Sequence, residues 1–113
     1  MTDTLTERWE AVCPQQRVEP ERGVAALVDG TQVAIFRTYD DQLFAIENRD
    51  PIAGANVMSR GIVGSRGEAP TVASPLHKEV YDLRTGECLD VAGVAVRTFA
   101  VRVRDGMVEV SAT

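Results

Sequence analysis

Apolar and polar residues alternate regularly near the end of the chain. Apolar side chains occupy every second position from Phe99 to Val103, and positions 102 and 104 hold arginine. Asp105-Gly106 follows, and Val108 and Val110 then resume the alternation. A period of two is that of a strand with one buried face, and Asp-Gly favours the two-residue turn of a hairpin. The pattern predicts a β-hairpin whose apolar residues face a core.

A second hairpin is expected from Val24 to Thr38, with Asp29-Gly30 as its turn. If Val28 lies opposite Thr31, the period of two puts one apolar set on the same face: Val24, Ala26, Val33 and Ile35. The other face then carries Leu27, Ala34 and Phe36. Because both faces are apolar, we expect other parts of the chain to cover this hairpin on both sides.

Shorter strands are indicated elsewhere by the same alternation, at Trp9–Cys13, Gln42–Ile46, Thr71–Ala73 and Val80–Leu83. The region between residues 48 and 83 is rich in residues that interrupt regular structure: Pro51, Gly54, Gly61, Gly64, Gly67, Pro70 and Pro75. We interpret these glycines as loop positions, because their spacing matches no phosphate-binding motif. No segment shows a long helical period. The chain is therefore predicted to be all-β, with a loop-rich middle region.

The totals exclude several classes of protein. The chain has 113 residues, which predicts one domain, with about the first eight residues as a loose lead-in. Its net charge of −5 disfavours nucleic acid and anionic membranes as partners. The N-terminus is polar and acidic, and no apolar run reaches membrane-spanning length, so we expect a cytoplasmic protein. Cys13 and Cys88 are then expected to be reduced thiols, with a disulfide or redox role as the alternative.

Two stretches of the middle region, Asn48–Ala55 and Ser74–Glu87, carry a resemblance to a known family. They resemble the two cluster-binding loops of Rieske iron–sulfur proteins, and the family's aromatic-Asp-Leu-x-Thr-Gly-Glu run is present as Tyr81–Glu87. The resemblance implies a Rieske-like (ISP-type) β-sandwich. Residues 48–83 would form its loop-rich, cluster-binding-like subdomain.

The ligand positions depart from the Rieske pattern. A Rieske cluster needs two thiolates on one iron and two imidazoles on the other. The two cysteine positions hold Asp50 and Ser74, the first histidine position holds Ile52, and only His77 matches. Isoleucine has no lone pair, and serine is a poor ligand for iron between soft sulfides. The resemblance therefore implies no metal and no cofactor on this chain.

A cluster cross-links the two loops that bind it, so its loss requires another contact between them. Ile52, Val57 and Leu76 are the apolar residues nearest the expected loop tips. We expect these three side chains to form an apolar plug, with Pro51 and Pro75 stiffening the loops.

The run Asn56–Gly64 is not general Rieske sequence, and it resembles the small subunits of assimilatory NAD(P)H-dependent nitrite reductases, a cluster-free branch of the family. This resemblance implies an accessory chain without catalytic residues. Its large-subunit partner would carry FAD, an iron–sulfur cluster and sirohaem, and would reduce nitrite to ammonia. Three alternatives stay open: an electron carrier with an unusual metal site, a cluster-free binding module, or an accessory domain of another oxidoreductase.

The loops Asp50–Arg60 and Ser74–Lys78 are expected to dock on the large subunit. The positive charge of this region comes from Arg49, Arg60, Arg66 and Lys78, which could form a docking patch or an ordinary solvated surface. The residues expected at this interface are Asp50, Asn56, Met58, Arg60, His77 and Lys78. Three of these residues have a simpler interpretation. His77 could be a loop residue rather than a proton donor, and Asp50 could initiate a turn rather than act as a base. Met58 could belong to the core.

Overall fold

The structure is a computed structural model that describes residues 8–111. Nearly all of the expected lead-in lies outside these residues. The described strands are β1 (Trp9–Pro14), β2 (Arg22–Val28), β3 (Thr31–Arg37), β4 (Leu43–Glu47), β5 (Ile62–Arg66), β6 (Ala69–Ala73), β7 (Val80–Asp82), β8 (Thr98–Arg104) and β9 (Met107–Ser111). Two short 3-10 helices are η2 (Gln15–Arg17) and η3 (Met58–Arg60). Within this part of the chain, no helix is long and apolar enough to cross a membrane.

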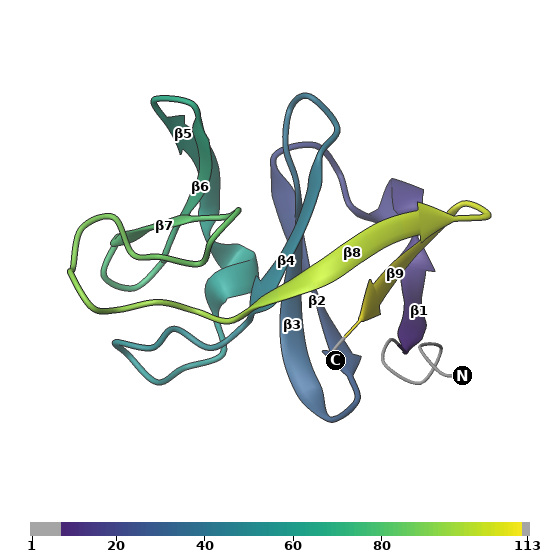
Figure 1. Cartoon of the computed structure of the whole chain (residues 1–113), viewed down its shortest axis with the longest axis horizontal. Coiled ribbons are helices and arrows are strands. Elements are labelled where there is room, and N and C mark those ends of the chain that lie inside the picture. Colours follow the sequence, from purple (N-terminus) through teal and green to yellow (C-terminus); the bar gives the residue numbers. More distant parts are fainter. Residues whose placement is uncertain (1–7, 112–113) are drawn as a thin grey trace, which may run out of the picture.

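Six strands form one sheet in the order β1-β9-β8-β4-β3-β2, and the prediction of an all-β fold is confirmed. The long strand β8 pairs with β4 at one end and with β9 along the rest, so the two halves of the sheet turn towards each other (Figure 1). A core cluster fills the space between the halves: Val18, Val28, Val33, Ile35, Ala45, Phe99, Val108 and Val110.

Both predicted hairpins have the expected registers. Val28 pairs with Thr31 in the first hairpin, and Val103 pairs with Val108 in the second. The residues of the turns, Asp29 and Asp105, have φ angles of 49° and 54°, as a two-residue turn of this kind requires. One detail was wrong: Leu27 is 64% exposed, so the second face of its strand is not covered at that position.

The remaining strands form a separate three-stranded sheet in the order β5-β6-β7, which stands beside β3 and β4 (Figure 1). The sequence did not predict β5, because Gly64 and a polar end obscure its alternation. Gly64 pairs with Thr71 in the sheet, so its interpretation as a loop residue was wrong. Gly61 does allow a close approach: a Cβ atom there would lie 2.5 Å from the carbonyl oxygen of Ala73.

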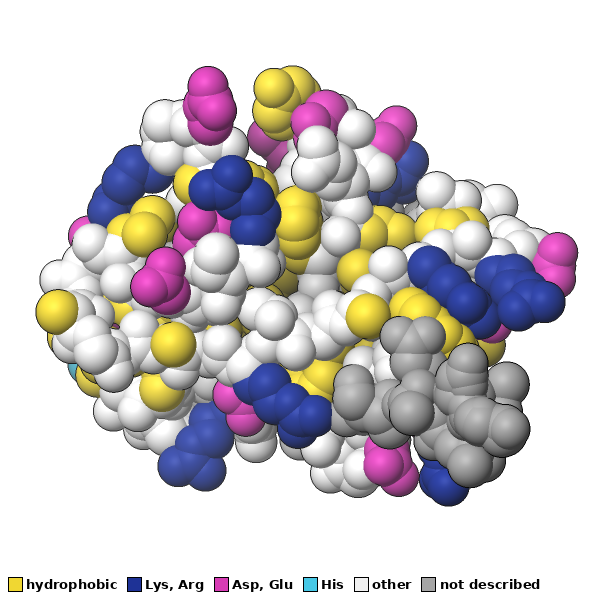
Figure 2. Space-filling model, in the orientation of Figure 1, with side chains coloured by type: hydrophobic (Ala, Val, Ile, Leu, Met, Phe, Trp, Pro, Cys, Tyr) yellow, Lys and Arg dark blue, Asp and Glu magenta, His cyan; other side chains and the backbone are white. Residues whose placement is uncertain are grey.

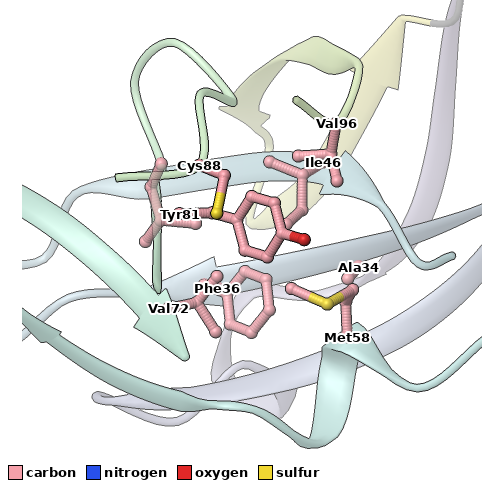
Figure 3. Close-up of a cluster of buried hydrophobic side chains, with 9 residues drawn as sticks. Ala34, Phe36, Ile46, Met58, Val72, Tyr81, Cys88 and Val96 are labelled. Carbon is pink, nitrogen blue, oxygen red and sulfur yellow. The ribbon is translucent and has the colours of Figure 1, made fainter. Parts of the chain in front are cut away.

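A second core cluster joins this small sheet to the outer face of β3 and β4. Figure 3 shows the Tyr81 ring at its centre, beside Phe36, Ile46 and Cys88. Met58 of η3 is fully buried in the same cluster. The strand β3 is therefore covered on both faces, as its two apolar sets predicted. The cluster also gives the loop-rich subdomain a rigid base.

Candidate functional site

Two loops of the same construction lie between the strands of the subdomain, and we call Asp50–Ala55 and Ser74–Glu79 the twin loops. In each loop the N–H of the first residue donates to the carbonyl of the sixth, at 2.8 and 2.9 Å respectively. The carbonyl of the first residue accepts from the N–H of the fifth, at 2.7 and 3.0 Å. The fifth residues, Gly54 and Lys78, have φ angles of 77° and 63°.

The first residues of the twin loops are joined by a hydrogen bond. The Ser74 hydroxyl donates to Asp50 Oδ2 at 2.5 Å, and both side chains are buried. The other oxygen, Asp50 Oδ1, accepts from the backbone N–H groups of Ile52 and Ala53 at 2.8 and 3.1 Å. This geometry confirms the interpretation of Asp50 as a turn residue, and it leaves the carboxylate no accessible face for a substrate.

The expected apolar plug is wrong. Ile52 and Leu76 are 44% and 49% exposed, so their side chains point out of the loops rather than into a shared interior. They occupy the same position, the third, in their respective loops. The buried link between the loops is polar, and the apolar tips are left on the surface.

Glu79 and Tyr81 extend the buried link towards the core, and the sequence did not predict this role for either. The Tyr81 hydroxyl donates to Glu79 Oε2 at 3.1 Å, and the Glu79 carboxyl lies beside that of Asp50. Burial, together with the Glu79 carboxylate, raises the pKa of Tyr81, so the phenol stays a donor. Because side chains two positions apart lie on the same face of a strand, Glu79 lies on the same face as the apolar ring of Tyr81. An acid at such an inward-facing position was the sequence signal that could have predicted this buried contact.

The pKa of Asp50 is lower than that of an ordinary aspartate. Burial by itself would raise this pKa, but hydrogen bonds from Ser74, Ala53 and Ile52 stabilise the charged form more strongly. Asp82 also has a lowered pKa, mainly because the Arg84 side chain donates to its carboxylate.

We expect acid to weaken the fold through these two aspartates. Their folded pKa values lie below the unfolded value of about 3.9, so the unfolded chain binds more protons at low pH. The stabilisation is complete above the unfolded pKa and is lost as the pH falls through the folded values. Urea unfolding between pH 7 and pH 3 measures this loss, and the D50N variant should show a smaller one. A D50N variant with the same pH dependence as the parent chain would contradict the assignment to Asp50.

The sequence resemblance places the two cluster-binding loops of Rieske proteins at the twin loops, and the residues present do not fit a 2Fe–2S cluster. Asp50 and Ser74 bond to each other, Ile52 offers no lone pair, and only His77 is a suitable donor. No group of three or more His, Cys, Asp or Glu side chains among residues 8–111 could hold a metal ion. Cys13 and Cys88 are free thiols in different core clusters.

The Tyr81–Glu87 run has a structural role in this chain. The Asp82 carboxylate accepts from the Arg84 backbone N–H at 2.8 Å, and the Asp82 carbonyl accepts from Gly86 at 2.7 Å. Gly86 has a φ of 83°, and its carbonyl accepts a hydrogen bond from the N–H of Val96 at 2.8 Å. The run is therefore a tight turn that fastens the subdomain to the segment entering β8.

The structure separates the six predicted interface residues into two groups. Four are exposed and free to contact a partner: Asn56, Arg60, His77 and Lys78. Asp50 and Met58 are fully buried, so the prediction that they contact a partner is wrong. Asp50 makes hydrogen bonds inside the domain and Met58 packs in the second core cluster, which explains why these residue types occur there.

A cleft lies between the β5–β6 hairpin and the turn that joins β3 to β4, and Figure 2 shows it as a hollow in the surface. Its charged lining residues are Glu21, Asp40, Glu68 and Arg84. The Arg84 guanidinium is already paired with Asp82 at 3.1 Å. The cleft is therefore acidic, and an acidic lining repels phosphate-bearing ligands such as a dinucleotide.

Comparison with known proteins gives a match over almost the whole described chain. Residues 8–111 match the family model of the Rieske-like [2Fe-2S] domain. The nitrite reductase (NADH) small subunit of Salmonella typhimurium is 42% identical over 90% of this chain and 95% of that protein. The solution structure of the Escherichia coli protein NirD has a TM-score of 0.85 and 38% identity, and covers 94% of this chain and 97% of that one.

A third relative is larger. The nitrite reductase [NAD(P)H] large subunit of Klebsiella oxytoca is 39% identical over 88% of this chain, and the match takes up 10% of its length. In that protein a domain similar to this chain is thus part of the large-subunit polypeptide.

Proposed function

The chain belongs to the Rieske-like [2Fe-2S] domain family, on the branch of nitrite reductase small subunits, and from this membership we propose that it is the non-catalytic small subunit of an NAD(P)H-dependent nitrite reductase. The observation that carries the proposal is the match over 95% of the Salmonella typhimurium small subunit. We place the redox centres, FAD, an iron–sulfur cluster and sirohaem, on the large subunit, and the complex in the cytoplasm.

The Klebsiella oxytoca relative supports the choice of partner. A domain similar to this chain lies within its large subunit, so the two parts belong to one polypeptide there. A covalent connection keeps two domains at a high effective concentration. A separate small subunit stays next to the large subunit only if it binds it. This chain therefore requires a docking surface.

We assign that surface to the tips of the twin loops. Ile52 and Leu76 are exposed at equivalent positions, and Pro51 and Pro75 beside them are exposed as well. Exposed polar and charged residues follow in both loop regions: Asn56, Arg60, His77 and Lys78. An apolar centre with a polar rim is the usual composition of a protein interface. Docked there, the chain would stabilise the large subunit or shape access to its redox centres.

Reversing charge at the rim should weaken the complex. In the R60E/K78E double variant we expect association with the large subunit to weaken about tenfold or more, because rim charges steer and orient docking. The matched control is R17E/R104E, which makes the same change in charge at η2 and at the end of β8, on the far side of the sheet from β5–β7 (Figure 1). Equal weakening in both variants would show a general charge effect and remove the assignment to these loops.

The function itself is tested by purification of the tagged chain from its own host grown on nitrate. We expect a large coloured protein in the eluate, together with nitrite-dependent oxidation of NAD(P)H. A colourless chain that elutes alone and without this activity would overturn the subunit proposal. A stand-alone binding module or an accessory domain of another oxidoreductase would then be the better assignment.

A further inference from the structure

The two linked residues of the twin loops stand at the positions of the two Rieske cysteines. In a Rieske centre both cysteines bind the same iron, so that iron connects the first residues of the two loops. Here those residues are Asp50 and Ser74, which are 24 positions apart in sequence and share one buried hydrogen bond. We propose that the polar network of Ser74, Asp50, Glu79 and Tyr81 replaces the iron as the cross-link that fixes the two loops in one arrangement.

The hydrogen bond between Ser74 and Asp50 has the properties that such a link needs. It joins a hydroxyl donor to a carboxylate acceptor, and hydrogen bonds to an ionised group are the stronger kind. Neither side chain is open to water, and a low local dielectric strengthens the bond. Asp50 Oδ1 is held by two N–H groups of its own loop, so the carboxylate cannot rotate away.

Among residues 8–111, neither the backbone hydrogen bonds of the loops nor their apolar tips supply the connection. The backbone hydrogen bonds that define the twin loops close each loop on itself. The apolar tips, Ile52 and Leu76, are exposed rather than packed together. Removal of the Ser74 hydroxyl would therefore leave a buried carboxylate oxygen without its donor, and the first loop would have to open to water to satisfy it.

Glu79 and Tyr81 connect this link to the core. The Tyr81 ring is buried in the second core cluster while its hydroxyl donates to Glu79, whose carboxyl lies beside Asp50. The other oxygen of Glu79, Oε1, has no hydrogen-bond partner within residues 8–111. An amide at this position always offers Asp50 a donor, whereas an ionised carboxylate offers none. The E79Q variant should therefore tighten the loops, whereas S74A should loosen them.

Amide hydrogen exchange on the full chain distinguishes these effects. The informative amides are those of Ile52 and Ala53, because Ser74 reaches the first loop only through Asp50. In S74A we expect their exchange to accelerate about tenfold to a hundredfold, the range that the loss of such a bond gives. In E79Q we expect slower exchange. Amides of β3 should be unchanged in both variants.

The matched control is S65A, an exposed serine of β5 in the same subdomain, which should leave all of these rates unchanged. Unchanged first-loop exchange in S74A would overturn the cross-link, and faster exchange in E79Q would remove Glu79 from it. If S74A does not fold, S74C carries the same test, because a thiol is a weaker donor than a hydroxyl. Accelerated first-loop exchange in S74C supports the proposal, and unchanged exchange overturns it.

The exchange experiment does not depend on the proposed function, but its consequence for docking does. If the loops must be held together to fit the large subunit, S74A should also bind it more weakly. If S74A shows faster first-loop exchange but binds the large subunit as before, the cross-link is supported and the twin loops are not part of the docking surface. Normal exchange in S74A, with weaker association in R60E/K78E, would keep the docking surface and remove the cross-link.

Discussion

The G86A variant should lose more than about 2 kcal/mol of folding free energy, because two separate penalties act at this position. Gly86 has a φ of 83°, in the left-handed region that residues with a Cβ adopt at a cost. An added Cβ atom would also lie 2.1 Å from the carbonyl oxygen of Val96, far inside van der Waals contact. Relief of that clash would break the hydrogen bond between Val96 and Gly86 that fastens the subdomain.

The matched control for this prediction is G106A, in the turn between β8 and β9. Gly106 has nearly the same φ, 77°, but no atom lies within 4 Å of its added Cβ. We expect G106A to lose only about 1 kcal/mol, the penalty for the backbone conformation. Urea unfolding of both variants measures the difference. Equal losses would show that the approach of Val96 to Gly86 is not tight in solution.

Truncation of Met58 should have the second large effect. This side chain is fully buried between the six-stranded sheet and the three-stranded sheet. M58A is therefore expected to lower the free energy of unfolding by about 2–5 kcal/mol, through lost burial and the cavity left behind. Urea unfolding gives the value. Where the variant is still folded, its association with the large subunit should be unchanged, because Met58 does not reach the surface.

I62A provides the comparison for M58A. Ile62 belongs to the same Asn56–Gly64 run and is 72% exposed on β5, so its truncation should change stability by no more than about 0.5 kcal/mol. Weaker association in M58A with stability intact would restore Met58 to the interface and contradict its place in the core.

The sequence by itself determined the hairpins and their registers. In each hairpin the Asp-Gly turn fixes which residues lie opposite each other, and the period of two then decides which side chains share a face. These are local relations, so a short stretch of chain contains all the information. The same holds for the incomplete Rieske ligand set, since the lack of suitable donors at Asp50, Ile52 and Ser74 is visible without any geometry.

The tertiary structure alone decided what holds the twin loops together. Asp50 and Ser74 become partners because each loop turns its first residue inwards, and no local rule pairs residues 24 positions apart. The expected plug of Ile52, Val57 and Leu76 followed from hydrophobicity alone, which does not say where an apolar side chain points. The same applies to Met58, whose burial depends on the small sheet that packs over it. Side-chain direction at loop tips and contacts between distant segments are properties of the folded chain, and there the sequence was insufficient.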